Sequence, residues 1–211
     1  MLKETSLYKQ HKALDAKLVN FAGYSMPVWY HNAKEEHLSV RSGIGIFDIS
    51  HMGMVVFNGH DAADFLQKVC TNDLNKTVNN KIIYTMILNE DGGILDDVMV
   101  GFNPELNRHF MIINASNKEK IMTWFEHNGL DLATVDVRFD THGLVAIQGP
   151  KAVETITDAF NINWNKLGRF QSQVVQIFGV DCLVMRTGYT GEDGIEISCP
   201  NEQIAEVWNK C

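Results

Sequence analysis

The spacing of apolar residues after residue 53 changes regularly between the periods of strands and helices. Runs rich in β-branched and aromatic residues predict strands at 54–59, 109–114 and 133–139, and a hairpin over 82–100. Apolar residues at helical spacing predict helices at 61–70 and 117–129. The resulting order, β-α-β-β-β-α-β, predicts an α+β unit with its helices packed on one face of an antiparallel sheet.

The same pattern begins a second time at residue 143. It predicts strands at 143–149, 172–179, 182–188 and 194–198, and helices at 150–160 and 201–210. This second unit reads β-α-β-β-β-α and lacks the last strand of the first unit. We therefore expect the chain to end inside its second unit and to leave an apolar sheet edge exposed.

The first 50 residues predict an entry segment with one clear helix. Asn32 is suited to be its N-cap, and Glu35 follows at the spacing of a capping box. Gly43 is suited to end the helix.

Two adjacent acids interrupt the return strand of the predicted hairpin. The turn "NEDGG" (89–93) precedes the strand "ILDDVMV" (94–100), which carries Asp96 and Asp97. Neighbouring side chains on a strand point to opposite faces, so both acids have apolar neighbours on their own face. An Asp here commonly caps a turn, pairs with a cation or faces solvent. The alternative is a carboxylate that orients a ligand amine or a reacting centre.

A glycine-rich loop, "RTGYTGEDGIEIS" (186–198), is the second unusual segment. Gly188, Gly191 and Gly194 indicate that its backbone comes close to another group. Glu196 lies between two isoleucines, and alternation turns it away from them. A hairpin turn with a solvent-facing Glu196 and a ligand-binding loop are equally compatible with this pattern. The loop lacks the Lys-Ser/Thr pair of a phosphate-binding P-loop.

Composition excludes several classes of protein. The 211 residues are 45% hydrophobic, and the net charge is 18 − 26 = −8, which argues against nucleic-acid binding. No apolar run is long enough to span a membrane, and the N-terminus has no signal-peptide pattern. The four cysteines are far apart, which favours a reducing cytoplasm. The eight histidines are scattered, so we expect no metal site.

Eight segments together resemble the aminomethyltransferases of the glycine cleavage system, the T-proteins. They occur in the order and spacing of that family and span nearly the whole chain: "LYKQH" (7–11), "NFAGYSMPVWY" (20–30), "VRSGIGIFDISHMG" (40–53), "TNDL" (71–74), "NEDGGILDDVMV" (89–100), "INASNKEK" (113–120), "IQGPKA" (147–152) and "RTGYTGEDGIEIS" (186–198). The resemblance implies two ferredoxin-like units with antiparallel sheets. Residues 1–50 and 138–211 would form a discontinuous, truncated folate-binding unit, and 51–137 an inserted unit.

The resemblance also implies a reaction. A one-carbon unit would pass from an aminomethylated lipoyl carrier protein to tetrahydrofolate, with release of ammonia, in the cytoplasm and without a metal. Asp97 matches the key aspartate of the family, and our hypothesis is that it orients the pterin and stabilises positive charge as N5 attacks. Glu196 matches the pterin-binding glutamate, which can accept two hydrogen bonds from the 2-amino and N3 edge.

Further positions match by resemblance. Four residues match the lining of the folate cavity: Met52, Tyr84, Met99 and Tyr189. Asn114 and Asn117 fall where the lipoyl arm of the substrate is expected to enter. Gly101 replaces a frequent tyrosine just beyond the strand, so we expect a thinner pocket wall there.

Two other functions remain open at this point. One is a sister folate-dependent demethylase, and the other is a folate-binding module without catalysis. The retained Asp97 favours an enzyme, and "GYTGEDGIE" and "SHMG" favour the aminomethyltransferase.

Overall fold

The chain forms two compact units in a computed structural model that describes residues 1–59, 61–161 and 163–211. Unit 1 contains Met1–His51, Asp140–Arg169 and Gln173–Cys211. Unit 2 contains Met52–Phe139 and Phe170–Ser172. The antiparallel α+β class predicted from the sequence is confirmed in both units.

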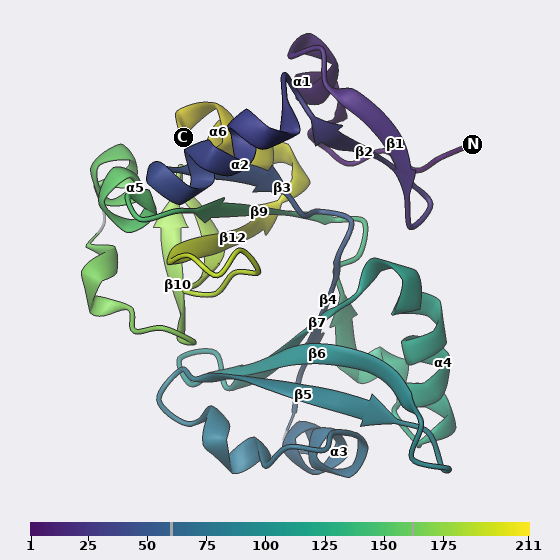
Figure 1. The fold of residues 1–211 in the computed structure, drawn as a ribbon. Helices are drawn as coiled ribbons and strands as arrows, with labels where there is room; N and C mark the ends of the chain where they lie inside the picture. The colour runs from purple at the N-terminus through teal and green to yellow at the C-terminus, as the bar shows by residue number, and fades with distance from the viewer. Residues whose placement is uncertain (60, 162) are drawn as a thin grey trace. The chain divides into compact units, whose positions relative to one another are not determined.

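Unit 2 has the element order predicted from its periodicity. The elements are β4 (Gly53–Phe57), α3 (Ala62–Val69), β5 (Ile82–Leu88), β6 (Ile94–Asn103), β7 (Arg108–Ile113), α4 (Lys118–His127) and β8 (Val135–Val137), with short 3₁₀ turns at Leu74–Thr77, Ala115–Asn117 and Leu132–Thr134. The strands form one antiparallel sheet in the order β5-β6-β7-β4-β8 (Figure 1).

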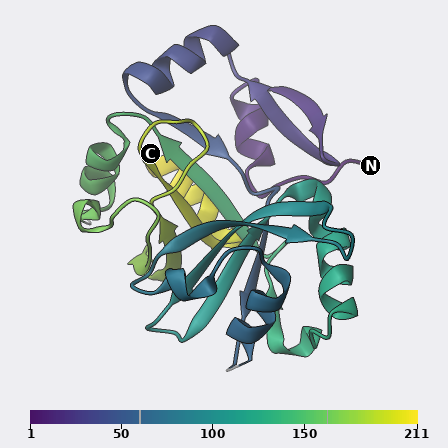
Figure 2. The ribbon, with the colours of Figure 1, turned by 60° about the horizontal axis from the view of Figure 1, so that its bottom comes forward.

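The core of unit 2 lies between this sheet and its two helices. Leu66 of α3 and Ile121 and Phe125 of α4 are fully buried against Val98 and Val100 of β6. Both helices therefore pack on the face of β6 that carries the even-numbered residues (Figures 1 and 2). Asp96 belongs to the same set of positions, which places a carboxylate at the edge of an apolar core.

Unit 1 repeats the arrangement. Its elements after residue 140 are β9 (His142–Gln148), α5 (Ala152–Phe160), a 3₁₀ turn (Trp164–Lys166), β10 (Ser172–Ile177), β11 (Val180–Met185), β12 (Gly194–Pro200) and α6 (Asn201–Lys210). The sheet order is β10-β11-β12-β9-β3, where β3 is Gly45–Asp48. Ile156 of α5 and Ile204 and Val207 of α6 are buried against Val145 and Ile195 of the sheet.

Strand β3 corrects one expectation. The element order after residue 142 ends on α6, as predicted, but β3 pairs antiparallel with β9 in the position that β8 takes beside β4. The edge of β9 is therefore occupied, and the expected exposed apolar edge at this position is wrong. The fifth strand comes from a segment about a hundred residues earlier in the chain.

The first 50 residues contain more structure than the one predicted helix. They form α1 (Tyr8–Ala13), the hairpin of β1 (Lys17–Phe21) and β2 (Tyr24–Trp29), α2 (Ala33–Ser42) and β3. Asn32 caps α2 as predicted, because its side chain accepts hydrogen bonds from the backbone N–H of Lys34 and Glu35. The returning acid is Glu36 and not Glu35, since Glu36 Oε1 accepts from the backbone N–H of Asn32 at 3.2 Å.

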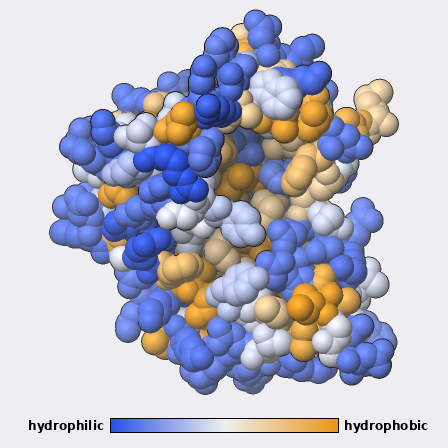
Figure 3. Space-filling view, viewed as in Figure 1, coloured by the Kyte–Doolittle hydropathy of each residue, from blue (hydrophilic) through white to orange (hydrophobic). Residues whose placement is uncertain are grey.

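The surface is mostly hydrophilic on the face drawn in Figure 3, with apolar side chains in separate patches. Several large apolar residues of the N-terminal segment are exposed, among them Phe21, Val28 and Trp29. Over the described ranges, no helix is both long enough and apolar enough to cross a membrane.

Candidate functional site

The turn between β5 and β6 fixes the positions of the two adjacent acids. Asn89 closes the turn, since its side-chain oxygen accepts from the backbone N–H of Asp91 and Gly93. Gly92 takes a positive φ of 80°, the conformation that glycine adopts without strain. In the resulting register, Asp96 lies opposite Ile87 and Asp97 opposite Met86, so the two carboxylates point to opposite faces of β6.

Asp96 is buried and makes a structural pairing. It is 2% exposed and accepts three hydrogen bonds. The backbone N–H of Asn114 donates at 3.1 Å, the Asn114 Nδ2 at 2.9 Å and the Asn117 Nδ2 at 2.6 Å. None of the ion pairs found among the described residues involves Asp96. Amide donors therefore satisfy this carboxylate without an ion pair.

Asp97 is exposed, and two side chains of unit 2 hold it. Tyr84 Oη donates to Asp97 Oδ2 at 2.9 Å, and Asn114 Nδ2 lies 3.3 Å from Asp97 Oδ1. Asn114 Nδ2 also donates to the Asp97 backbone carbonyl at 2.8 Å. A carboxylate with both oxygens contacted and one side open to solvent can accept a ligand proton or balance a nearby positive charge.

The other predicted site residues of unit 2 lie on neighbouring strands. Tyr84 lies directly opposite Met99 in the β5–β6 pair, and both flank Asp97 on the same face. Tyr84 is 52% exposed, whereas Met99 is half-buried. Met52, directly before β4, is half-buried, and the hydrogen bonds around Asp97 do not include it.

Gly101 requires a correction. It lies inside β6 rather than beyond it, and it pairs with Phe110 of β7. A Cβ on Gly101 would lie 2.3 Å from Phe110 Cζ, so the phenyl ring occupies the space above the glycine. Phe110 fills the sheet surface at this point, while the expected thinner pocket wall stays a prediction.

The asparagines expected at the entrance of the lipoyl arm lie directly before α4. Their side-chain amides are both directed to Asp96, and Asn114 also reaches Asp97. Their role toward a substrate arm stays a prediction. The structure gives them a second task, the fixing of the two carboxylates.

Glu196 of unit 1 is buried rather than solvent-facing. Its side chain is on β12 opposite Met185 and Ala146, and the residue is 6% exposed. Thr187 Oγ1 donates to Glu196 Oε2 at 2.6 Å. Burial raises the pKa of the Glu196 carboxyl above its ordinary value, although the hydrogen bond from Thr187 acts in the opposite direction.

The glycine-rich loop surrounds a glutamine side chain of β9. Gln148 is fully buried, its Nε2 donates to the Thr187 carbonyl at 3.0 Å, and its Oε1 accepts from Thr190 Oγ1 at 2.9 Å. A Cβ at Gly188 would lie 1.8 Å from Gln148 Oε1, and one at Gly194 would lie 2.5 Å from Gln148 Nε2. Gly188 therefore accommodates the Gln148 side chain, and Gly194 accommodates both that side chain and the Ile147 carbonyl, 2.4 Å from the Cβ position. The sequence pattern did not identify Gln148.

The ends of this loop are fixed by an ion pair, while its tip is open. Arg186 donates from Nε to Asp193 Oδ1 at 3.1 Å and from Nη2 to the other carboxylate oxygen. Arg186 holds the pKa of Asp193 below its ordinary value through these hydrogen bonds. Tyr189, at the tip, is fully exposed.

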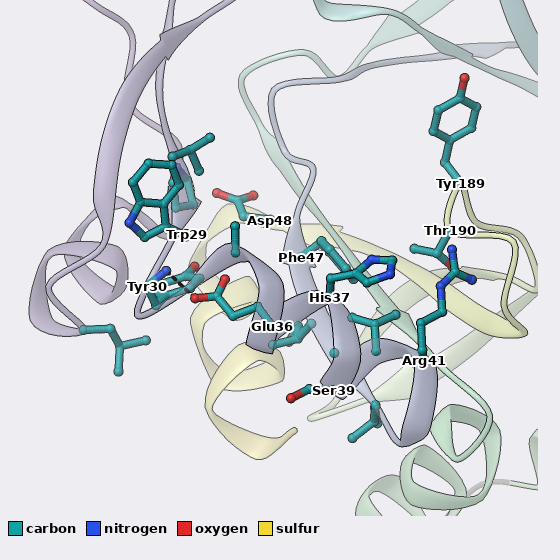
Figure 4. Close-up of a pocket in the computed structure, with 18 of the residues that line it drawn as sticks. Trp29, Tyr30, Glu36, His37, Ser39, Arg41, Phe47, Asp48, Tyr189 and Thr190 are labelled. Carbon is teal, nitrogen blue, oxygen red and sulfur yellow. Dashed lines mark hydrogen bonds between the residues drawn. The ribbon is translucent and has the colours of Figure 1, made fainter.

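A pocket of about 630 Å³ lies within unit 1 and was not predicted (Figure 4). Residues of β2, α2, β3 and α6 line it, and Tyr189 and Thr190 lie at one end. Of the residues predicted to line a folate cavity, Tyr189 borders this pocket. Glu196 and the predicted site residues of unit 2 are not among the described residues that line it.

One wall of this pocket contains a buried hydrogen-bond chain. His11 Nε2 lies 2.8 Å from Asp48 Oδ2, and His11 Nδ1 lies 2.9 Å from Tyr30 Oη. Thr5 Oγ1 also donates to Asp48 Oδ2 at 2.6 Å. Burial alone would raise the pKa of Asp48, but its hydrogen bonds, that of His11 foremost, lower it. These hydrogen bonds tie α1 to β3.

No cluster of metal-binding side chains occurs in the residues that the structure describes. The two carboxylates predicted from the sequence have different surroundings, since Asp97 of unit 2 is exposed and Glu196 of unit 1 is buried. Sequence alternation indicated the direction of each side chain. The partners Asn114, Thr187 and Gln148 come from other segments, and the sequence carries no local signal of those contacts.

Comparison with known proteins identifies related sequences along almost the whole chain. Residues 7–211 match the family model described as the GCVT N-terminal domain. The aminomethyltransferase of Caldanaerobacter subterraneus subsp. tengcongensis is 41% identical over 211 residues, which cover 99% of this chain and 56% of that protein. A probable aminomethyltransferase of Pyrococcus horikoshii is 41% identical over 205 residues, which cover 93% of this chain and 51% of that protein. The chain thus spans little more than half the length of these relatives.

Solved structures agree with the sequence matches. The aminomethyltransferase T of the glycine cleavage system from Bartonella henselae superimposes with a TM-score of 0.89 at 33% identity, covering 100% of this chain and 57% of that one. Heterotetrameric sarcosine oxidase from Corynebacterium sp. U-96 gives a TM-score of 0.57 at 12% identity, covering 86% of this chain and 89% of that one. The second match shows a shared fold alone.

Proposed function

The chain belongs to the family of the GCVT N-terminal domain, and from that premise we propose that its function is aminomethyl transfer in the glycine cleavage system. The substrate is an aminomethyl group on the lipoyl arm of a carrier protein, and tetrahydrofolate accepts the one-carbon unit. Ammonia and the dihydrolipoyl arm are released. The identity of about 40% to aminomethyltransferases along the whole chain carries this proposal.

Asp97 is the proposed catalytic residue. Its carboxylate is open to solvent on one side, and Tyr84 and Asn114 restrain it on the other. When N5 of tetrahydrofolate attacks the methylene carbon, positive charge develops on that nitrogen. A carboxylate held nearby stabilises this charge, and it needs little reorganisation because its hydrogen bonds are already formed.

Glu196 is the proposed pterin-binding residue, and Tyr189, Tyr84, Met99 and Met52 are its proposed companions in the folate cavity. A buried carboxylate with a single side-chain donor, Thr187, has acceptor capacity left for the 2-amino and N3 groups of a pterin. A ligand without those donors would leave the acid unpaired, and this disfavours its binding. We assign residues 1–50 and 138–211 to the folate-binding unit on this basis, and propose a cytoplasmic location.

The test is turnover of an aminomethylated lipoyl carrier with tetrahydrofolate, followed through methylene-tetrahydrofolate and ammonia. Asp97→Asn is expected to lower kcat by about 10²- to 10⁴-fold, because the negative charge is lost while the shape is kept. Asp91→Asn, in the exposed turn of the same hairpin, is the matched control and should turn over like the unmodified chain. Equal turnover by Asp97→Asn would exclude the proposed role.

Titration with 5-formyl-tetrahydrofolate in a calorimeter separates catalysis from binding. Heat of binding that disappears in Glu196→Ala supports the pterin role. Binding without turnover would favour the folate-binding module, and turnover of a methylated amine in place of the carrier would favour the demethylase. The likeness to sarcosine oxidase is one of fold, so it does not raise the demethylase above the aminomethyltransferase.

A further inference from the structure

The proposed catalytic residue has a second, buried carboxylate as its neighbour on the chain. Asp96 is 2% exposed and lies among core residues, where an acid is costly unless its oxygens are satisfied. Three amide N–H groups satisfy it, two from Asn114 and one from Asn117. These hydrogen bonds explain how the acid is tolerated. They also favour an acid over its amide, because N–H donors face both carboxylate oxygens and the NH₂ group of an asparagine would meet at least one of them.

The side chain of Asn114 connects the two acids. Its Nδ2 lies 2.9 Å from Asp96 Oδ1, 2.8 Å from the Asp97 carbonyl and 3.3 Å from Asp97 Oδ1. An amide nitrogen carries two hydrogens, so one of them serves Asp96 Oδ1 and the other is shared between the carbonyl and Oδ1 of Asp97. The oxygen of the same amide would meet three oxygens and be repelled.

The Asp96 carboxylate and the Asp97 oxygens favour the same orientation of the Asn114 amide. An ionised carboxylate only accepts hydrogen bonds, so it selects the orientation in which Asn114 turns its NH₂ group inward. An asparagine at position 96 could donate as well as accept. Because the backbone N–H of Asn114 would keep the asparagine oxygen at the Oδ2 position, the NH₂ group of that asparagine would face the Asn114 NH₂ group and weaken its hold on the Asp97 oxygens.

We propose that Asp96 is a positioning residue for aminomethyl transfer. By accepting from Asn114 and Asn117, it holds the Asn114 NH₂ group on the Asp97 carboxylate and so fixes Oδ1, the oxygen that Tyr84 does not contact. Asp96 acts through Asn114 and touches no reacting atom. This inference rests on the proposed function in which Asp97 acts on the one-carbon transfer.

The first measurement is of geometry and is independent of activity. The side-chain NH₂ protons of Asn114, identified by their loss in Asn114→Ala, are observed by nuclear magnetic resonance in the full chain. We expect slow solvent exchange in the unmodified protein and at least about tenfold faster exchange in Asp96→Asn, since the amide is no longer locked. Asp91→Asn, which also removes one negative charge from this hairpin, should leave the signals unchanged. Unchanged signals in Asp96→Asn would overturn the proposal.

The second measurement is of rate. Asp96→Asn is expected to lower kcat about 10- to 100-fold while KM for tetrahydrofolate stays within about twofold, because the ligand is still bound but Asp97 is misdirected. The double variant Asp96→Asn/Asp97→Asn should be no slower than Asp97→Asn alone, since Asp96 acts only through Asp97. A normal kcat in Asp96→Asn, or additive losses in the double variant, would overturn the proposal.

The two measurements separate this inference from the proposed function. If Asp97→Asn turns over normally, the proposed catalytic role fails, while the Asn114 signals still report whether Asp96 orients the amide. If Asp96→Asn does not fold, Asn117→Ser is tested in its place. That variant removes one hydrogen-bond donor to Asp96 and changes no charged group. This variant should lower kcat about two- to fivefold with KM for tetrahydrofolate unchanged. A normal kcat in this variant would count against the proposal.

Discussion

Asp97 and Glu196 are both carboxylates on antiparallel strands, but their surroundings are opposite. Asp97 is exposed and is contacted through both carboxylate oxygens, by a phenol and an amide. Glu196 is buried, and a single hydroxyl, that of Thr187, donates to it. Two donors restrain the exposed acid, whereas the buried acid has one donor and is restrained by packing.

This difference separates two tasks that one functional group can perform. An exposed carboxylate held by two hydrogen bonds keeps its direction, which suits the stabilisation of a developing positive charge. A buried carboxylate with spare acceptor capacity suits recognition, because a ligand with matching donors supplies the missing hydrogen bonds. Environments that separate the behaviour of two acids in this way are typical of functional sites.

The largest expected effect comes from filling the space beside Gln148, near the buried acid. Gly188→Ala places a Cβ 1.8 Å from Gln148 Oε1, so either the loop or the glutamine must move. We expect the free energy of unfolding to fall by about 2–3 kcal/mol, at the upper end of overpacking effects. Urea unfolding followed by circular dichroism measures it.

The double variant Gln148→Ala/Gly188→Ala is the control for this steric argument. Removing the glutamine opens the space, so the double variant should be no less stable than Gln148→Ala alone. If the two losses are additive, the glycine is needed for another reason.

Removing the charge of Glu196 has the next largest expected effect. Burial raises its folded-state pKa above the ordinary value of 4.5, so the folded state binds the proton more tightly than the unfolded state. The stability associated with this group is therefore present below about pH 4.5 and is lost as the pH rises through the folded-state pKa. Glu196→Gln keeps an acceptor for the Thr187 hydroxyl and cannot ionise, so its stability should not fall as the pH rises through the pKa of Glu196.

We expect Glu196→Gln to be more stable than the unmodified chain at pH 8, by about 1.4 kcal/mol for each unit by which the pKa is raised. The two should be equally stable near pH 4. Urea titrations across this pH range test the difference, and Glu105→Gln, an exposed acid in the β6–β7 connection, is the control. Equal stabilities at all pH values would mean that Glu196 is solvated in solution.

These comparisons also show which parts of the molecule could be predicted from the sequence. Alternation along β6 correctly placed Asp96 and Asp97 on opposite faces, because side-chain direction on a strand is a local property. The pattern around Glu196 predicted its direction but not its burial, since burial depends on what covers the strand.

Contacts between distant segments could not be predicted. The pairing of β3 with β9 joins residues about a hundred positions apart, and the four residues of β3 carry too short a pattern to indicate a strand. The glycines of the loop signalled a close approach, but nothing near them in the sequence identified Gln148. The position of Phe110 above Gly101 could not be predicted either, because cross-strand neighbours are set by register and not by order along the chain.

The smallest expected effect comes from changing a partner of the exposed acid, Asp97. Tyr84→Phe removes the hydroxyl that donates to Asp97 Oδ2 at 2.9 Å and keeps the ring. Because the site is exposed, water replaces the lost donor, and the free energy of unfolding should change by less than about 0.5 kcal/mol. Asp97 would keep Asn114 as its second restraint, so kcat for aminomethyl transfer should fall only about two- to fivefold. Turnover assays and urea unfolding of the same sample measure both quantities. A loss as large as that of Asp97→Asn would instead make the Tyr84 hydroxyl part of the reaction, and the exposed acid would then depend on one donor, as the buried acid does.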